Sequence, residues 1–161
     1  LHHMKNPEKG LKILLDLLEP HGFLKLGLYS KLARRHIVKV KDYAKKNNVK
    51  DIKIFRQMLI SRSEDKDLSR IFDRADFYST SSLKDLIFHV QEHTFTIPQL
   101  SKIFNKFNLE FLGFSNSLIK LKYNRIYNLD KKNINLSSWH QFEKDNPETF
   151  IGMYKFWVRK F

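Results

Sequence analysis

Three short apolar runs, separated by much longer helical patterns, constrain the fold of this chain most. They cover residues 23–28, 109–114 and 153–158, and each has the length of a strand. The first is nearly continuous in apolar residues, so we expect a strand buried on both faces. It follows a turn at residues 19–22 and a helical stripe made by Leu11, Leu14, Leu15 and Leu18. Helix, turn and buried strand together indicate an α/β layer.

The segments between these runs read as helices with recognisable starts. We expect Ser30 to begin a long helix, Asp51 to cap the next, and residues 79–82 to cap a third that continues through Val90. Residues 96–99 form a capping box, and the helix after it ends at Asn108 in a left-handed conformation. Residues 116–135 are predicted to be partly helical, and a short helix is expected to begin at residue 137 or 138.

Composition indicates one globular domain. The chain has 161 residues, 42% of them apolar, with 14 Phe, 6 Tyr and 2 Trp, which is enough for a real core. We expect Trp139 and Trp157 to lie in that core. There is no Cys, so disulfides and thiolate metal sites are excluded and a cytoplasmic protein is expected. No apolar run approaches the length of about 20 residues that spans a bilayer, so we expect no membrane partner.

The formal charge of +13 leaves the choice of partner open. A basic protein favours nucleic acid, anionic lipid or acidic protein partners. The excess is mostly Lys, however, with frequent Asn and few Gly, a composition that A/T-rich coding also produces. The Lys-rich segment 31–46 could make the chain a basic helical module, but no helix-turn-helix, zinc or RNP-type signature accompanies it.

Several motifs in register resemble one enzyme family. The start of the chain, Leu1-His2-His3-Met4, precedes a Leu-rich helix, a Pro/Gly turn and a strand. Further matching segments follow at residues 27–34, 76–79, 88–96, 139–143 and 150–158. Together they resemble the C-terminal half of class I S-adenosylmethionine-dependent methyltransferases, in particular bacterial ones fused to tetratricopeptide repeats. On this basis we interpret residues 1–4 as native sequence rather than the remnant of a tag.

The resemblance implies a fold and a division of labour. The three runs would be the fifth, sixth and antiparallel seventh strands of a doubly wound, Rossmann-like sheet. Residues 31–95 would be a large helical insertion over the carboxyl ends of the strands, where ligands bind in such sheets, and hence a candidate substrate lid. The glycine-rich turn and the ribose-binding acidic residue of the family find no match here. The expected cofactor is S-adenosylmethionine, with its binding half missing from the chain, and the N-terminal half is an expected partner.

The same resemblance suggests site residues. His2 and His3 are candidates for the cofactor side. Tyr29, Ser30 and Arg34, at the end of the first strand, are candidates for binding the methyl acceptor, with Asp76 and Tyr78 as weaker ones. His89, Glu92 and His93 have the i, i+3, i+4 spacing of one helical face and are candidate general bases or hydrogen-bonding anchors. We expect no metal there, because a single helix rarely completes a metal site.

Each candidate also has a structural interpretation. Ser30 could be a simple helix cap, Arg34 a solvated charge, and the three residues near position 90 could be hydrogen-bonded for structure alone. The sequence names no methyl acceptor. A non-catalytic remnant of a methyltransferase stays open beside the enzyme and the basic module.

Overall fold

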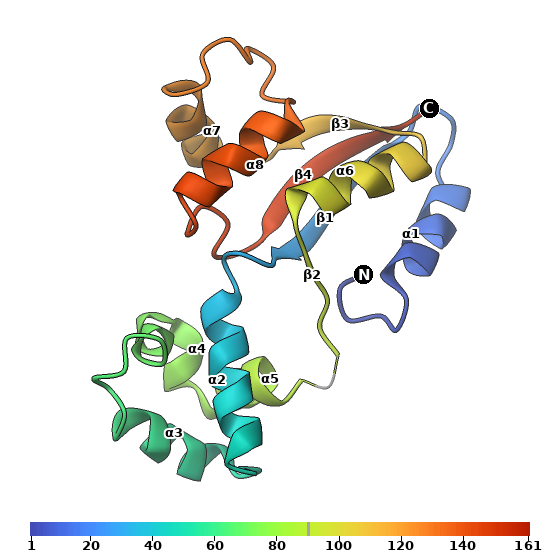
Figure 1. Ribbon diagram of the computed structural model, residues 1–161. Coiled ribbons are helices and arrows are strands. Elements are labelled where there is room, and N and C mark those ends of the chain that lie inside the picture. The colour runs from blue at the N-terminus through green and yellow to red at the C-terminus, as the bar shows by residue number, and fades with distance from the viewer. Residues whose placement is uncertain (90) are drawn as a thin grey trace. The chain divides into compact units, whose positions relative to one another are not determined.

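The computed structural model describes residues 1–89 and 91–161 and divides into two compact units (Figure 1). Unit 1 comprises Leu1–Ala33 and Gln91–Phe161 and holds the whole sheet. Unit 2 is Arg34–Val90, of which residues 34–89 are described, and these form only helices and turns. The fold is therefore mixed α/β, and the helical unit lies inside the expected insertion at 31–95.

The sheet of unit 1 has four strands, not the three expected. They are β1 (Phe23–Ser30), β2 (Thr94–Phe95), β3 (Leu109–Phe114) and β4 (Tyr154–Lys160), in the order β2-β1-β4-β3. The last strand, β4, pairs antiparallel with both β1 and β3, as expected for the final strand. The additional strand, β2, pairs parallel with β1 only at Tyr29 and Ser30. Two residues carry no readable alternation, which is why the sequence did not reveal it.

One face of this sheet holds the core of unit 1. Leu26 and Leu28 of β1 and Phe156 and Val158 of β4 point to this face and are buried. Four helices pack on it, α6 and α8 lying across it in Figure 1. They are α1 (Pro7–Asp16), α6 (Ile97–Lys106), α7 (Ser117–Asn124) and α8 (Leu136–Asp145). Aromatic rings dominate near α8: Trp139 stacks on Tyr123 with ring centroids 3.7 Å apart.

The opposite face of the sheet is open, which corrects two predictions. Phe23 and Lys25 are exposed, so β1 is buried on one face rather than on both. Trp157 lies on this face and is 40% exposed, so it is not a core residue, unlike Trp139. The apolar run misled because Lys25 and Gly27 interrupt it at alternate positions, which is the period of a strand with one wet face.

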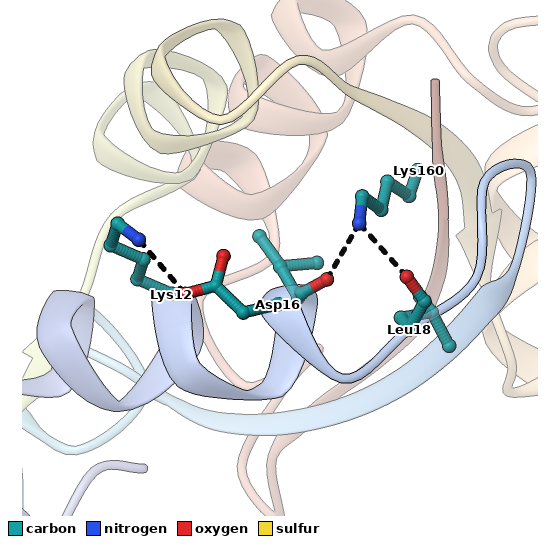
Figure 2. Close-up of polar contacts among 5 residues, drawn as sticks. Lys12, Asp16, Leu18 and Lys160 are labelled. Carbon is teal, nitrogen blue, oxygen red and sulfur yellow. Dashed lines mark hydrogen bonds and ion pairs between the residues drawn. The ribbon is translucent and has the colours of Figure 1, made fainter.

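Local sequence accounts for the ends of the helices. Asn6 caps α1 by accepting from Lys9 N, and Thr96 and Gln99 form the predicted capping box of α6. At its other end α1 is joined to β4: the Lys160 ammonium donates to the carbonyls of Leu15 and Leu18, each at 2.8 Å (Figure 2). A cation on the last carbonyls of a helix is favourable electrostatically.

Among the residues that the structure describes, four other than glycine adopt left-handed backbone conformations: His21, Asn48, Asn108 and Asn133. Asn108 follows α6, as predicted, with φ 51°. Asn48 follows α2 (Arg35–Lys46) and closes it with backbone bonds from Asn48 N to Lys45 O and from Val49 N to Ala44 O. Asparagine thus performs the role that glycine usually has in such helix ends.

Unit 2 has a separate core. Its elements are α2, α3 (Ile52–Ile60), the 3-10 helix η1 (Ser69–Asp73), α4 (Ala75–Tyr78) and α5 (Thr80–Phe88). Val40, Phe55, Leu59, Ile71 and Leu83 are fully buried in it. Ser79 caps α5 as predicted, but the helix ends at Phe88; Val90, which was expected to extend it, lies outside the described residues.

The predicted start of the long helix at Ser30 is wrong. Ser30 is the last residue of β1, and α2 begins only at Arg35. The Ser30 hydroxyl does accept from Ala33 N at 3.0 Å, but this bond stabilises a turn rather than a helix. Among the described helices, none has both the length and the apolar character needed to cross a membrane.

Candidate functional site

The candidate site lies at the carboxyl end of β1, where aromatic and imidazole rings gather. The His2 ring packs against the Tyr29 ring, with centroids 4.4 Å apart, and against His3 at 4.2 Å. His2 Nδ1 lies 3.2 Å from the carbonyl oxygen of Gly27, two residues before Tyr29. His2 and His3, which were assigned to the cofactor side, therefore share a site in unit 1 with Tyr29, which was assigned to the substrate side.

Residues 91–93 border the same cluster. The His93 N–H donates to the His2 carbonyl at 2.8 Å, and His3 Nδ1 lies 3.0 Å from the Gln91 carbonyl. The Gln91 amide approaches His93 Nε2 at 3.4 Å. Two segments distant in sequence are thus joined by one backbone hydrogen bond and one contact from a side chain to the backbone, immediately before β2 begins. Glu92, between them, lies near enough for its charge to raise the pKa of His2.

The surroundings of His2 favour the neutral form of its ring. Burial lowers the pKa of the His2 imidazole below its ordinary value, and the neighbouring His3 lowers it further. A carbonyl oxygen can only accept, so the neutral ring donates to Gly27 from Nδ1, and Nε2 is left as the acceptor. A neutral imidazole with an accepting Nε2 has the chemistry of a general base.

The helical face predicted for His89, Glu92 and His93 does not exist. His89 is the C-cap of α5 in unit 2, whereas Glu92 and His93 follow in an irregular segment of unit 1 that leads into β2. The i, i+3, i+4 spacing of these three residues has no helical meaning, because α5 ends at Phe88. His89 instead borders a shallow hollow with Ser81, Lys84, Asp85 and Phe88.

A buried polar network next to β1 was not predicted. Glu143 of α8 is 2% exposed and accepts from the Ser30 hydroxyl at 2.6 Å and from the Tyr154 hydroxyl at 2.7 Å. Burial raises the pKa of the Glu143 carboxyl, and the two hydroxyls lower it in part. The signal available in the sequence was a Glu at an inward position of an amphipathic helix, next to Phe142.

Ser30 therefore lies in a different environment from the one predicted for a substrate ligand. Its side chain is fully buried, donates to Glu143 and accepts from Ala33 N. In this structure the hydroxyl joins β1 to α8, and a role of Ser30 in binding an acceptor stays a prediction.

The other predicted substrate residues lie in unit 2. Arg34 is 3% exposed, so it is not the solvated charge that its structural interpretation assumed. Asp76 accepts from Arg74 Nε and Nη2 at 3.0 and 2.8 Å. Tyr78 is exposed at the end of α4. Asp76 and Tyr78 are thus surface residues of a short helix, and their role in binding an acceptor stays a prediction.

No metal site is apparent, since the described residues contain no group of three or more His, Cys, Asp or Glu placed to hold a metal ion. No family model matches the sequence, and a search of curated proteins also gives no match. Function therefore has to be inferred from the chain itself.

Proposed function

We propose that this chain supplies the substrate-side half of an S-adenosylmethionine-dependent methyltransferase. The observation that carries the proposal is the cluster of His2, His3 and Tyr29 at the carboxyl end of β1, with Glu92 and His93 beside it. Ligands of open α/β sheets bind at this edge. An antiparallel final strand, the one the resemblance implies, is a second support.

The edge of β1 also supports a partner half. On the side away from β4, β2 pairs only with Tyr29 and Ser30, and among the described residues no strand pairs with 23–28 on that side. A strand edge on which no other strand is paired favours the addition of another strand. A cofactor-binding half would find its place there.

The residues at this edge fit one side of the cofactor only. The rings of His2 and His3 could line the path of the methyl group. The glycine-rich turn that allows close approach to the cofactor, and the acidic residue that binds its ribose, have no match in the sequence. When bound, the cofactor would supply an electrophilic methyl group. The chain's own contribution would be to orient the acceptor for in-line attack, with His2 Nε2 or the His93 imidazole accepting its proton.

Calorimetric titration of the chain with S-adenosylmethionine tests the first part of the proposal. We expect no saturable binding by the 161-residue chain, and micromolar binding would show that it is not the half without the cofactor site. The DNA upstream of the Leu1 codon should encode strands and a glycine-rich loop in the same frame. The longer product should then bind the cofactor.

Mutation of the longer protein tests the site. His2→Ala and His93→Ala should each lower turnover at least about tenfold. This is a minimum, because a general base typically contributes about a hundredfold or more. His140→Ala, on α8, is the matched control and should retain wild-type turnover. Wild-type rates for both site variants would remove the cluster from the mechanism.

A second candidate function is binding of single-stranded nucleic acid by the open face of the sheet. There Lys25 Nζ lies 5.5 Å from the Trp157 ring centroid. Arg159 of β4 lies opposite Phe23 of β1 in the antiparallel pairing of the two strands. Cations interleaved with exposed aromatic rings suit phosphates and stacked bases. This surface differs from the Lys-rich segment 31–46 that the composition indicated.

Tryptophan fluorescence separates this candidate from the first. Trp139 is fully buried and Trp157 is partly exposed, so quenching by an oligothymidylate would report the sheet face. The candidate predicts quenching that is lost in Trp157→Phe and weakens as salt rises. An unchanged spectrum, or quenching that survives Trp157→Phe, would exclude it.

A further inference from the structure

The helix α7 and the loop after it present large aliphatic side chains to solvent. Leu118 is 69% exposed, Leu121 60%, Ile126 61% and Leu129 94%. Ile126 and Leu129 line the same shallow hollow, and Leu118 and Leu121 are one helical turn apart on α7. Isolated exposed leucines are ordinary, but four exposed large aliphatic residues within twelve positions of one segment call for an explanation.

The segment is held firmly from its inner side. Tyr123 is fully buried, stacks on Trp139, and donates from its hydroxyl to Asp130 at 2.7 Å. The Asp130 carboxylate also accepts from the backbone of Ile134 and Asn135. These bonds fix both ends of the loop, so the aliphatic residues point outward in a defined structure rather than in a disordered tail.

The surroundings of this surface are strongly basic. Residues 117–132 contain five basic residues and a single acidic one, Asp130, whose oxygens are engaged in the bonds just described. Most of the basic side chains are exposed: Lys122, Arg125, Lys131 and Lys132. We define the α7 surface as these four cations with Leu118, Leu121, Ile126 and Leu129.

We propose that the α7 surface binds the surface of an anionic lipid bilayer. Leucine and isoleucine would enter the boundary between headgroups and acyl chains, and the surrounding cations would contact the anionic headgroups. The proposal needs no spanning helix. The sequence-based expectation of no membrane partner rested on the length of apolar runs, which is informative about spanning and not about surface binding.

Two other classes of partner fit the α7 surface less well. Cores of protein interfaces are enriched in aromatic residues and depleted in Lys, whereas this surface is aliphatic and mostly lysine-bordered. Single-stranded nucleic acid needs exposed rings for stacking, but Tyr123 is buried and Tyr127 stacks on it, with centroids 4.9 Å apart. The bilayer alone uses both the aliphatic side chains and the lysines.

Vesicle co-sedimentation of the 161-residue chain tests the proposal. We expect binding to phosphatidylcholine vesicles in which about one lipid in three is phosphatidylserine, and little binding to phosphatidylcholine alone. Raising NaCl from about 0.1 M to about 1 M should release the chain, because the Debye length falls from about 10 Å to about 3 Å. Equal binding to both kinds of vesicle, or no binding to either, would overturn the proposal.

Matched variants show whether the α7 surface is responsible. Leu129→Ser should weaken binding about tenfold, the loss expected for one buried leucine, whereas Leu17→Ser, at a leucine after α1 that is 80% exposed, should not. Lys131→Gln with Lys132→Gln should weaken it by a similar factor, and Lys102→Gln with Lys144→Gln, on α6 and α8, should weaken it less. Equal losses for surface and control variants would refute the assignment.

All of these residues are exposed, so the variants should fold; the thermal midpoint of each checks this. The proposal is independent of the methyltransferase proposal. The vesicle experiment contains no cofactor, and the cofactor titration contains no lipid, so either can fail alone. Release of the chain from vesicles by an oligonucleotide, together with wild-type binding by Leu129→Ser, would assign the surface to nucleic acid instead.

Discussion

At the scale of single residues, the most consequential group is the buried carboxyl of Glu143. Its hydrogen bonds join α8 to two strands, to β1 through Ser30, 113 residues earlier in the sequence, and to β4 through Tyr154, 11 residues later. Because a buried carboxylate is costly unless it is well bonded, this position influences stability more than any exposed charge.

The pH dependence of stability should report this carboxyl. Burial raises the pKa of Glu143 above that of the unfolded chain. Its stabilising contribution is therefore complete below the ordinary glutamate pKa of about 4.3, and it is lost as the pH rises through the folded-state pKa. Urea unfolding from pH 4 upward should show wild type losing stability relative to Glu143→Gln.

The comparison between the two proteins removes the effects of other carboxyls, which have the opposite sign when they are stabilised in their charged form. Glu64→Gln, at an exposed position, is the control and should follow the wild-type curve. Parallel curves for wild type and Glu143→Gln would show that the folded-state pKa is not raised.

At the scale of elements, sequence reasoning succeeded where a local chemical signal exists. The capping box at Thr96, the left-handed Asn108 and the presence of a final strand were predicted from residues within a few positions, whereas the antiparallel direction of that strand was implied by the family resemblance. It failed where the outcome depends on distant contacts. The pairing of β2 with Tyr29 arises from tertiary packing that its two residues do not encode. The open face beside Trp157 and the burial of Glu143 had only weak local signals, whose outcome was decided by packing.

The candidate site shows the same division. His2, His3 and Tyr29 lie together, and the roles that the resemblance suggests for them stay predictions. The supposed helical face at His89 depended on continuing a helical period past the end of α5. Where a helix ends is decided within one or two residues, so a spacing argument that crosses such an end is fragile.

The capping box of α6 gives a prediction at this scale. Thr96→Ala removes the hydroxyl that accepts from Gln99 N, so the free energy of unfolding should fall by about 1 kcal/mol. Ser101→Ala in the interior of the same helix is the control and should change it little. Urea unfolding of the three proteins measures the difference. Equal stability of Thr96→Ala and wild type would mean that the cap contributes nothing.

At the scale of the whole molecule, the two units have separate cores. The points at which the chain leaves unit 1 and returns to it lie close together: Lys31 N donates to Phe95 O at 2.8 Å. Replacing residues 34–90 by a short Gly/Ser linker should therefore leave unit 1 folded, with Trp139 buried and the thermal midpoint within about 5 °C of the same transition in the full chain.

Tryptophan emission and circular dichroism check this expectation. Phe156→Ala in the shortened chain should lower the free energy of unfolding by about 3–5 kcal/mol, which shows that the measurement detects damage to the unit 1 core. A shortened chain whose Trp139 emission is that of an unfolded protein would show that unit 1 depends on the excised residues.

The left-handed asparagines have a consequence for how this protein can evolve. With five glycines in 161 residues, the chain closes α2 and α6 with Asn48 and Asn108, where a residue without a side chain would meet no steric penalty. Each position is thus one substitution away from a more stable molecule. A stabilising substitution at either position could later offset the loss of folding stability caused by a mutation elsewhere in the chain.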